Sequence, residues 1–175
     1  DSILVLPGRA RDPAGSVRVR WNGTWLDTLA PTRKVIVNGL GGNDFIRISP
    51  SARLLQSTEL NGGDGNDHLF AGRYGSVIDG GDGNDLLIGG IGEDQLLGRN
   101  GADRLIGGRG NDALFGGGGL DRLYGGADDD YLDGGSLEDG GVDDEEADRL
   151  VGAGGADSFV WRMLDLFFGV KNEDE

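Results

Sequence analysis

Aspartate recurs at every ninth residue over most of this sequence, and no other chemically active side chain does so. From Gly62 the chain divides into eleven nine-residue units without a gap, and the sixth position of the unit is aspartate in ten of them. These aspartates are Asp67, Asp85, Asp94, Asp103, Asp112, Asp121, Asp130, Asp139, Asp148 and Asp157, with Ser76 as the exception. The chain has no cysteine and one histidine, which excludes disulfides, thiolate zinc sites, cysteine nucleophiles and a two-histidine metalloprotease motif. Carboxylates are therefore the groups that any repeated site would use.

The rest of the unit predicts how these aspartates are positioned. Glycine is common at the first, second and fourth positions of the unit, as in GGDGNDLLI at 80–88, and it permits the positive φ angles of a tight turn. The eighth position is apolar in ten of the eleven units, so the last three residues can form a very short strand with one inward side chain. A disordered glycine-rich linker has no reason to hold both patterns in phase.

One buried leucine per unit cannot offset the entropy of ordering nine residues, so the units must stack on one another. Two units would make one coil, which places residues 18 apart directly above each other. The pattern therefore predicts an all-β fold, a right-handed parallel β-roll or β-helix of nine-residue repeats, preceded by a small region of strands and a hairpin.

Composition and charge change near residue 61. Residues 1–61 hold all four prolines and carry a net charge of +3, whereas residues 62–175 hold 30 of the 36 glycines and carry −18. We expect residues 1–61 to form an N-terminal β region, with a hairpin around Asn22-Gly23 and further strands at 35–37 and 45–48.

The repeats end at residue 160, so the sequence predicts a repeat domain over 62–160 and a C-terminal segment over 161–175. This segment holds Trp161, Leu164, Phe167 and Phe168, and we expect it to cover the open apolar end of the stack. The acidic end and the missing initiator methionine predict that the chain is truncated.

The unit resembles the glycine-rich nonapeptide GGxGxDxUx of the RTX family, the hemolysin-type calcium-binding repeats. The resemblance covers about 62–160 and is most specific over 80–124. A partial copy, GLGGNDFIR at 39–47, has Asp44 at its sixth position but lies outside the nine-residue phase. The resemblance implies a parallel β-roll whose loops bind Ca²⁺ between coils through the aspartate and backbone carbonyls, the hard oxygen ligands that Ca²⁺ prefers.

If the loops alternate between the two edges of such a roll, the resemblance assigns the sites by position. One edge would carry Asp67, Asp85, Asp103, Asp121, Asp139 and Asp157, and the other Ser76, Asp94, Asp112, Asp130 and Asp148. Five gaps on the first edge and three on the second then have an aspartate on both sides, which predicts about eight Ca²⁺ ions. The degenerate stretch 134–151 leaves two alternatives open, because it could remain one distorted coil or bulge out as a loop.

The net charge of −15 opposes binding to nucleic acid or to an anionic membrane, and no apolar run approaches the roughly 18 residues that span a bilayer. No catalytic constellation is visible, so we expect no enzyme activity in this chain. The resemblance implies a calcium-binding module of a secreted bacterial protein that leaves the cell through type I export machinery and folds outside in calcium. Two alternatives stay open: the C-terminal module of a secreted metalloprotease, lipase or epimerase whose catalytic part lies upstream, and a surface adhesin or structural repeat.

Overall fold

The computed structural model describes residues 1–7, 17–22, 24–25, 34–49, 57–135, 148–160 and 166–168. Every regular element in these ranges is a β-strand, and no helix there is long and apolar enough to cross a membrane. The strands are β1 (Ser2–Pro7), β2 (Val17–Trp21), β3 (Thr24–Trp25), β4 (Lys34–Gly41), β5 (Phe45–Ile48), β6 (Ser57–Asp64), β7 (His68–Phe70), β8 (Ser76–Asp82), β9 (Leu86–Ile91), β10 (Gln95–Asn100), β11 (Arg104–Arg109), β12 (Ala113–Gly118), β13 (Arg122–Ala127), β14 (Tyr131–Asp133), β15 (Arg149–Val151), β16 (Ser158–Val160) and β17 (Leu166–Phe168).

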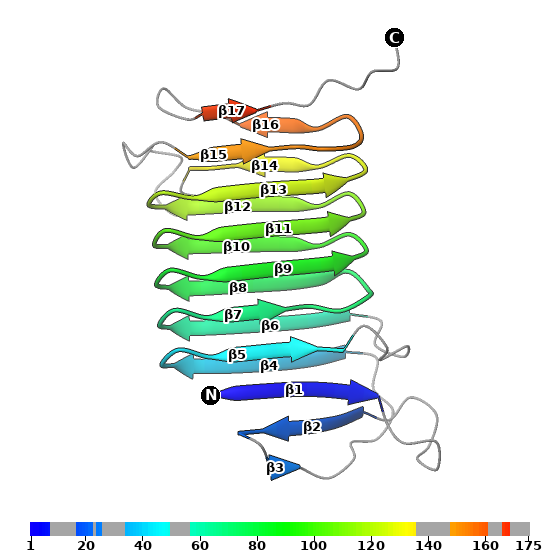
Figure 1. The fold of residues 1–175 in the computed structure, drawn as a ribbon, viewed down its shortest axis with the longest axis vertical. Coiled ribbons are helices and arrows are strands. Elements are labelled where there is room, and N and C mark those ends of the chain that lie inside the picture. Colours follow the sequence, from blue (N-terminus) through cyan, green and yellow to red (C-terminus); the bar gives the residue numbers. More distant parts are fainter. Residues whose placement is uncertain are drawn as a thin grey trace.

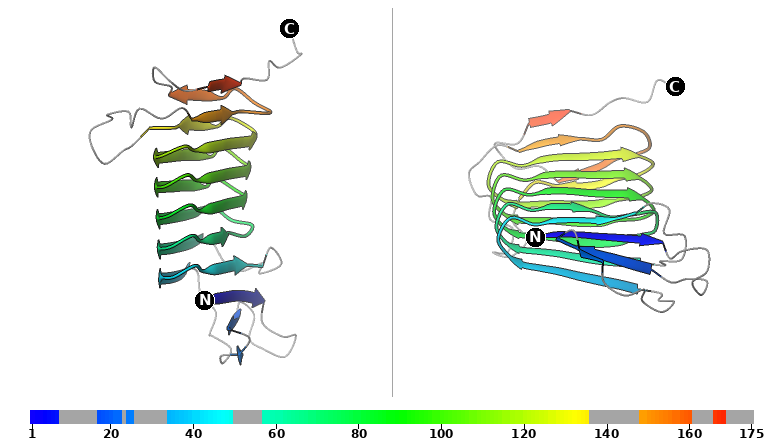
Figure 2. Two further views of the ribbon diagram at one scale, coloured as in Figure 1. Left: turned by 60° about the vertical axis from the view of Figure 1, so that its left-hand side comes forward. Right: turned by 60° about the horizontal axis from the view of Figure 1, so that its bottom comes forward.

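The strands form two sheets that lie face to face (Figures 1 and 2). One sheet has ten strands in the order β17-β15-β13-β11-β9-β7-β5-β1-β2-β3, and the other has seven in the order β16-β14-β12-β10-β8-β6-β4. From β4 onward successive strands alternate between the sheets, and each pairs in parallel with the strand one coil later. Leu105 is thus paired with both Leu87 and Leu123, which lie 18 residues away on either side. The predicted all-β parallel roll is confirmed.

A single column of apolar side chains fills the space between the sheets. Each strand of the repeats turns its eighth-position residue inward, between a more exposed seventh and ninth position. The fully buried members of this column are Ile46, Leu60, Leu69, Ile78, Leu87, Leu96, Leu105, Leu114, Leu123, Leu132 and Leu150, each with no exposed surface. Burying one such side chain contributes about 1.5–3 kcal/mol, so the stack gains stability with every coil added.

The turns between the strands require left-handed backbone at the second and fourth positions of the unit. Gly81 and Gly83 show this conformation, with φ angles of +105° and +130°. Leu40, Arg99 and Asp128 occupy equivalent turn positions with φ between +79° and +84°, a conformation that costs a residue with a Cβ about 1–2 kcal/mol. The turn geometry is therefore a property of the repeat, and glycine adopts it without the free-energy cost that a residue with a Cβ incurs.

The first coils lie before residue 62. β4 pairs in parallel with β6, and β5 with β7, both with an offset of 23 residues, as in Lys34 with Ser57. The five residues beyond the usual 18 fall between β5 and β6, which explains why the partial repeat at 39–47 lies outside the nine-residue phase. The change of composition near residue 61 therefore does not coincide with an edge of either sheet. The division of the chain into an N-terminal region over 1–61 and a repeat domain over 62–160 stays a prediction.

A second break in register lies between β14 and β15. Arg122 pairs with Arg149 and Tyr131 pairs with Ser158, both with an offset of 27 residues. One nine-residue unit is therefore inserted between these coils without adding a strand to the described part of either sheet. Residues 136–147, with Asp139 among them, lie outside the described residues. The prediction of Asp139 between Asp121 and Asp157 on one edge is wrong, because an insertion of nine residues shifts the chain by half a coil and leaves the sequence phase unchanged.

Four further strand pairings extend the ten-stranded sheet at its two ends. β1 pairs in parallel with β5 and antiparallel with β2, and β2 pairs antiparallel with β3 around Asn22, whose φ is +46°. At the other end β17 pairs with β15, with Phe167 in register with Leu150. Trp161 and Leu164 lie outside the described residues, so the capping role of 161–175 stays a prediction.

Candidate metal centre

The sixth-position aspartates lie at the two edges of the roll, where each loop turns into a strand. Their side chains are almost completely buried, with 0% to 3% of the surface exposed from Asp67 to Asp130. In each case Oδ1 accepts a hydrogen bond from the sixth-position backbone N–H of the neighbouring coil. The N–H of Asp85 donates to Asp103 Oδ1 at 2.7 Å, and the N–H of Asp94 donates to Asp112 Oδ1 at 2.8 Å. The aspartates therefore connect successive coils in two continuous rows.

The other carboxylate oxygen, Oδ2, is buried without a hydrogen-bond partner. Within the described ranges this holds for Oδ2 of Asp44, Asp67, Asp85, Asp94, Asp103, Asp112 and Asp130. A buried polar atom without a partner costs about 1–3 kcal/mol, and more when it is charged. Native proteins contain only a few such atoms per 100 residues, so seven at equivalent positions of the two rows indicate that a ligand of positive charge completes these loops.

A backbone carbonyl of the next coil converges on the same space as Oδ2 of Asp44, Asp67, Asp85, Asp94, Asp103 and Asp112. A Cβ atom placed on Gly80 would touch Asp85 Oδ2 and would lie 2.8 Å from the carbonyl oxygen of Gly98. On the other edge a Cβ atom on Gly89 would lie 2.5 Å from Asp94 Oδ2 and 2.7 Å from the carbonyl oxygen of Gly107. Where a carboxylate follows, as after Gly80 and Gly89, the two oxygens therefore require a glycine at the first position, and a larger residue would displace them.

Burial is the main cause of a raised pKa in these carboxyl groups. It raises the pKa of Asp85 and Asp112 to about 7, with a further rise from the neighbouring carboxylates of the stack, and that of Asp94, Asp103 and Asp130 to about 6. The backbone N–H that each carboxylate accepts opposes the rise. Burial also raises the pKa of Asp67 and Asp157. The metal-free roll therefore holds its carboxyl groups in an environment that disfavours their charge.

These shifts predict how metal-free stability depends on pH. A pKa that is higher in the folded state than its unfolded value of about 3.9 stabilises the fold at low pH, and this contribution is lost as the pH rises through the folded pKa. Protein stripped of metal on a chelating resin should therefore be more resistant to urea at pH 5 than at pH 8, with the change centred between about pH 6 and 7. Stability that rises between pH 5 and 8 in the stripped protein would contradict the buried carboxylate rows.

The two rows differ in membership from the assignment made on sequence. Asp121 N–H donates to Asp148 Oδ1 at 2.7 Å, and Asp130 N–H donates to Asp157 Oδ1 at 3.2 Å. Asp148 therefore belongs to the first row and Asp157 to the second, the reverse of the prediction. The first row consists of Asp44, Asp67, Asp85, Asp103, Asp121 and Asp148, and the second of Asp94, Asp112, Asp130 and Asp157.

Sequence reasoning gave Asp44 no place in the rows. The N–H of Asp44 donates to Asp67 Oδ1 at 2.7 Å, so the first row begins one coil earlier than residue 62. The GND triplet shared by 42–44, 65–67 and 83–85 was the available signal. The same triplet marks a second ladder, at the fifth position, in which Asn66 N–H donates to Asn43 Oδ1 and Asn84 N–H donates to Asn66 Oδ1. These exposed amides support the loops that carry the aspartates.

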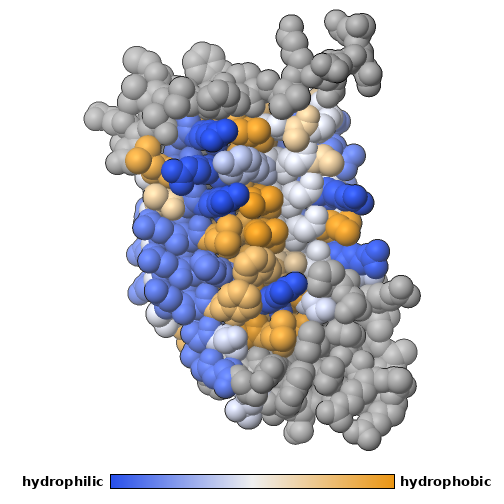
Figure 3. All heavy atoms as spheres, viewed as in Figure 1, coloured by the Kyte–Doolittle hydropathy of each residue, from blue (hydrophilic) through white to orange (hydrophobic). Residues whose placement is uncertain are grey.

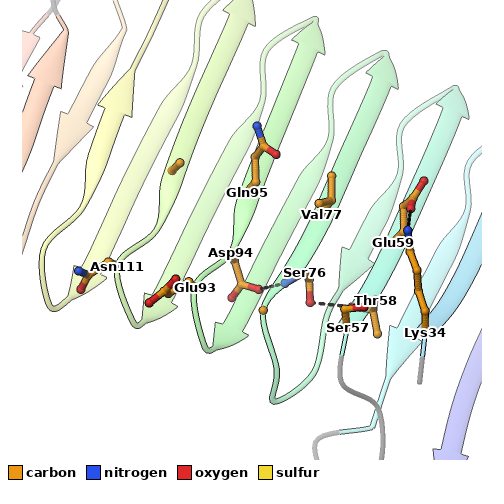
Figure 4. A pocket seen from close by; sticks show the side chains of 12 residues that line it. Lys34, Ser57, Thr58, Glu59, Ser76, Val77, Glu93, Asp94, Gln95 and Asn111 are labelled. Atoms are coloured by element: carbon orange, nitrogen blue, oxygen red, sulfur yellow. Dashed lines mark hydrogen bonds and ion pairs between the residues drawn. The ribbon is translucent and has the colours of Figure 1, made fainter. Parts of the chain in front are cut away.

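The second row ends at Ser76, beside a hollow of about 510 Å³ (Figure 4). Ser76 N–H donates to Asp94 Oδ1 at 2.7 Å, and Thr58 Oγ1 donates to Ser76 Oγ at 2.6 Å. Ser76 Oγ in turn donates to the carbonyl of Tyr74 at 2.9 Å. Lys34 and Glu59 form an ion pair in the lining of the same hollow. Hydrogen bonds between neutral groups thus hold this end of the edge in place of carboxylates.

The residues present fit a hard cation bound between coils. No group of three or more His, Cys, Asp or Glu side chains gathers to hold a metal ion in the part of the chain that the structure describes. An ion between two loops would therefore take some ligands from carboxylate Oδ2 atoms and the remainder from backbone carbonyls. Such a set of oxygens suits Ca²⁺, which accepts six to eight oxygen ligands in variable geometry, better than it suits Zn²⁺ or Mg²⁺.

The fold and its two rows of buried carboxylates define a parallel β-roll whose loops present oxygen ligands once per coil. A comparison with protein families matches the RTX calcium-binding nonapeptide repeat (4 copies) at residues 61–96, 97–132 and 106–139. RTX calcium-binding nonapeptide repeats are therefore detected in residues 61–139 of the chain, as the resemblance predicted. No curated protein and no solved structure matches the chain significantly.

Proposed function

We propose that Ca²⁺ ions bind between successive coils of the roll and that the sixth-position aspartates are their anionic ligands. The two rows of buried Oδ2 atoms without partners carry this proposal, because six of these atoms lie where a cation would meet a carbonyl of the next coil. The members are those of the two rows, Asp44, Asp67, Asp85, Asp103, Asp121 and Asp148 on one edge and Asp94, Asp112, Asp130 and Asp157 on the other.

The rows provide five gaps between aspartates on the first edge and three on the second. We therefore expect about eight ions, as predicted from sequence, although Asp44 replaces Asp139 in the count. About eight ions would bring a charge of about +16, close to the −18 of residues 62–175, so binding would remove most of the repulsion within the repeats.

We further propose that calcium binding drives folding and that the protein acts outside the cell. Free Ca²⁺ at the roughly 10⁻⁴–10⁻³ M that extracellular modules bind would fold the repeats after type I export, whereas the empty repeats repel themselves. That the chain is a module of a secreted enzyme or of an adhesin stays a prediction about the parent protein.

The break in register offers a sharp test of the ligand assignment. In a calorimetric calcium titration, Asp148→Asn should bind about one ion fewer than the parent. The amide keeps the Oδ1 acceptor but removes the anionic oxygen that would bind the ion. Asp139→Asn is the matched control and should bind as many ions as the parent, because Asp121 connects directly to Asp148. An equal loss in the two variants would contradict the rows described above, and no loss in Asp148→Asn would contradict the role of the aspartates.

A further inference from the structure

The outer face of the ten-stranded sheet carries no acidic side chain in the described strands, although the chain has a net charge of −15. The outward positions of β5, β7, β9, β11, β13 and β15 hold arginine, histidine, aromatic and aliphatic residues. The outer face of the seven-stranded sheet differs, because Glu59 there pairs with Lys34 and Asp79 pairs with Arg99. The basic groups of the ten-stranded face thus lie on a different surface from the acidic side chains of the loops.

Two parallel columns run along this face. The seventh positions of β11, β13 and β15 place Arg104, Arg122 and Arg149 on adjacent paired strands. The ninth positions beside them place Ile88, Ile106, Tyr124 and Val151 in a half-buried apolar column. Figure 3 shows this face, with an apolar stripe along its middle and strongly hydrophilic side chains beside the upper part of the stripe.

Two of the three arginines in this column lie over an aromatic ring. The guanidinium groups of Arg104 and Arg149 lie 5.4 Å and 6.0 Å from the centre of the Tyr124 ring. Neither Arg104 nor Arg122 has an acidic group within ion-pair distance among the described residues. Both residues are exposed, and the ring orients the guanidinium group of Arg104, which suits the bidentate binding of an anion.

We propose that this face binds a linear acidic polysaccharide, a polymer of uronic acids that lies along the axis of the roll. Adjacent strands are about 4.8 Å apart, so the column presents one guanidinium per strand at that spacing. A uronic acid polymer carries one carboxylate per sugar ring, and the length of a ring is close to this spacing. The apolar column and the Tyr124 ring would receive the C–H faces of the sugars, while the arginines bind the carboxylates.

Other anionic partners fit this face less well. Sequence-tolerant binding of a single-stranded nucleic acid relies on aromatic rings for successive bases, whereas the two rings of the ninth-position column, Phe70 and Tyr124, are separated by two isoleucines. Membrane insertion requires apolar side chains that reach into the lipid, whereas Ile88, Ile106 and Val151 are half-buried between their neighbours. Bound calcium would lower the repulsion between the acidic protein and a polyanion. The docking proposal rests on the proposed function only through this effect.

The test measures binding of a fluorescently labelled galacturonate hexamer to the full chain in saturating calcium, by anisotropy. A short oligomer is used because longer polygalacturonates associate with calcium themselves. Arg104→Gln/Arg122→Gln should weaken binding by roughly tenfold, since two charge-assisted pairs are lost. The matched control, Arg73→Gln/Arg109→Gln, removes the same charge from two third-position residues, one between β7 and β8 and one at the end of β11, and should change the affinity by less than about threefold.

Equal losses in the two double variants would overturn the proposal, because net charge alone would then explain binding. Absence of binding by the parent chain would also overturn it, whatever the response of that chain to calcium. Phosphatidylserine vesicles and a single-stranded oligonucleotide serve as competing probes. If either binds through Arg104 and Arg122 at least as tightly as the hexamer, the face is not a polysaccharide site. The proposed function is tested separately, by the calcium-induced far-UV signal of the parent chain.

Discussion

Removal of calcium at neutral pH is expected to convert the repeats from β structure to a coil-like chain, and millimolar Ca²⁺ is expected to restore the fold. The reason lies in the rows of buried carboxylates, because each coil must bury charged oxygens that no protein donor satisfies. The single apolar column has one side chain per strand to offset this cost. The measurement is a calcium titration followed by far-UV circular dichroism and by the hydrodynamic radius, which should fall as the β signal appears.

Magnesium provides the control for this experiment. Mg²⁺ requires near-ideal octahedral geometry and gives up its water reluctantly, so loops that depend on backbone carbonyls should bind it poorly. Millimolar Mg²⁺ should therefore leave most of the chain unfolded. A far-UV spectrum that does not change when calcium is chelated at neutral pH would contradict the account.

Asp112→Asn is expected to have opposite effects on the calcium-bound and the metal-free forms. The amide keeps the Oδ1 atom that accepts the N–H of Asp94 and replaces the anionic Oδ2. In calcium the variant should lose about two ions, because Asp112 lies between Asp94 and Asp130 in the second row. In metal-free protein the same variant should keep its far-UV β signal to a higher pH than the parent, because a carboxyl group whose burial raises its pKa to about 7 no longer has to be charged.

Asp94→Asn is the matched comparison on the same edge. Asp94 has an aspartate on one side and Ser76 on the other, so this variant should lose about one ion, half the loss of Asp112→Asn. His68→Ala, at an exposed seventh position, should change neither the ion count nor the metal-free stability. Calorimetric ion counts, and the pH at which the metal-free β signal is lost, report the two effects. Equal ion losses for Asp112→Asn and Asp94→Asn would show that sites are not shared between neighbouring coils.

The nine-residue period was sufficient to predict the sheets, the core and the rows of aspartates. A parallel roll repeats its geometry with every coil, so the position of Leu105 in one unit specifies that of Leu123 two units later. The inward eighth position and the turning second and fourth positions follow from single residue types, leucine and glycine. These features depend on local pattern, which a sequence displays directly.

The nine-residue period does not show which aspartates are connected between coils, because this depends on the lengths of two insertions. The five extra residues between β5 and β6 hid the place of Asp44 by breaking the phase. The nine extra residues between β14 and β15 preserved the phase and reversed the edges of Asp148 and Asp157. Register across an insertion is decided by which strands pair, and the pairing of β13 with β15 is a long-range contact that no local pattern reports.

The most direct test of the central claim is to locate the calcium ions by anomalous X-ray scattering at long wavelength, in crystals grown in calcium. We predict anomalous peaks between successive coils, beside the Oδ2 atoms of residues such as Asp85, Asp103 and Asp112, with about five along the first row and about three along the second. Peaks that lie only on the exposed fifth-position ladder, or no peaks between the coils, would contradict the claim that calcium completes the buried aspartate rows.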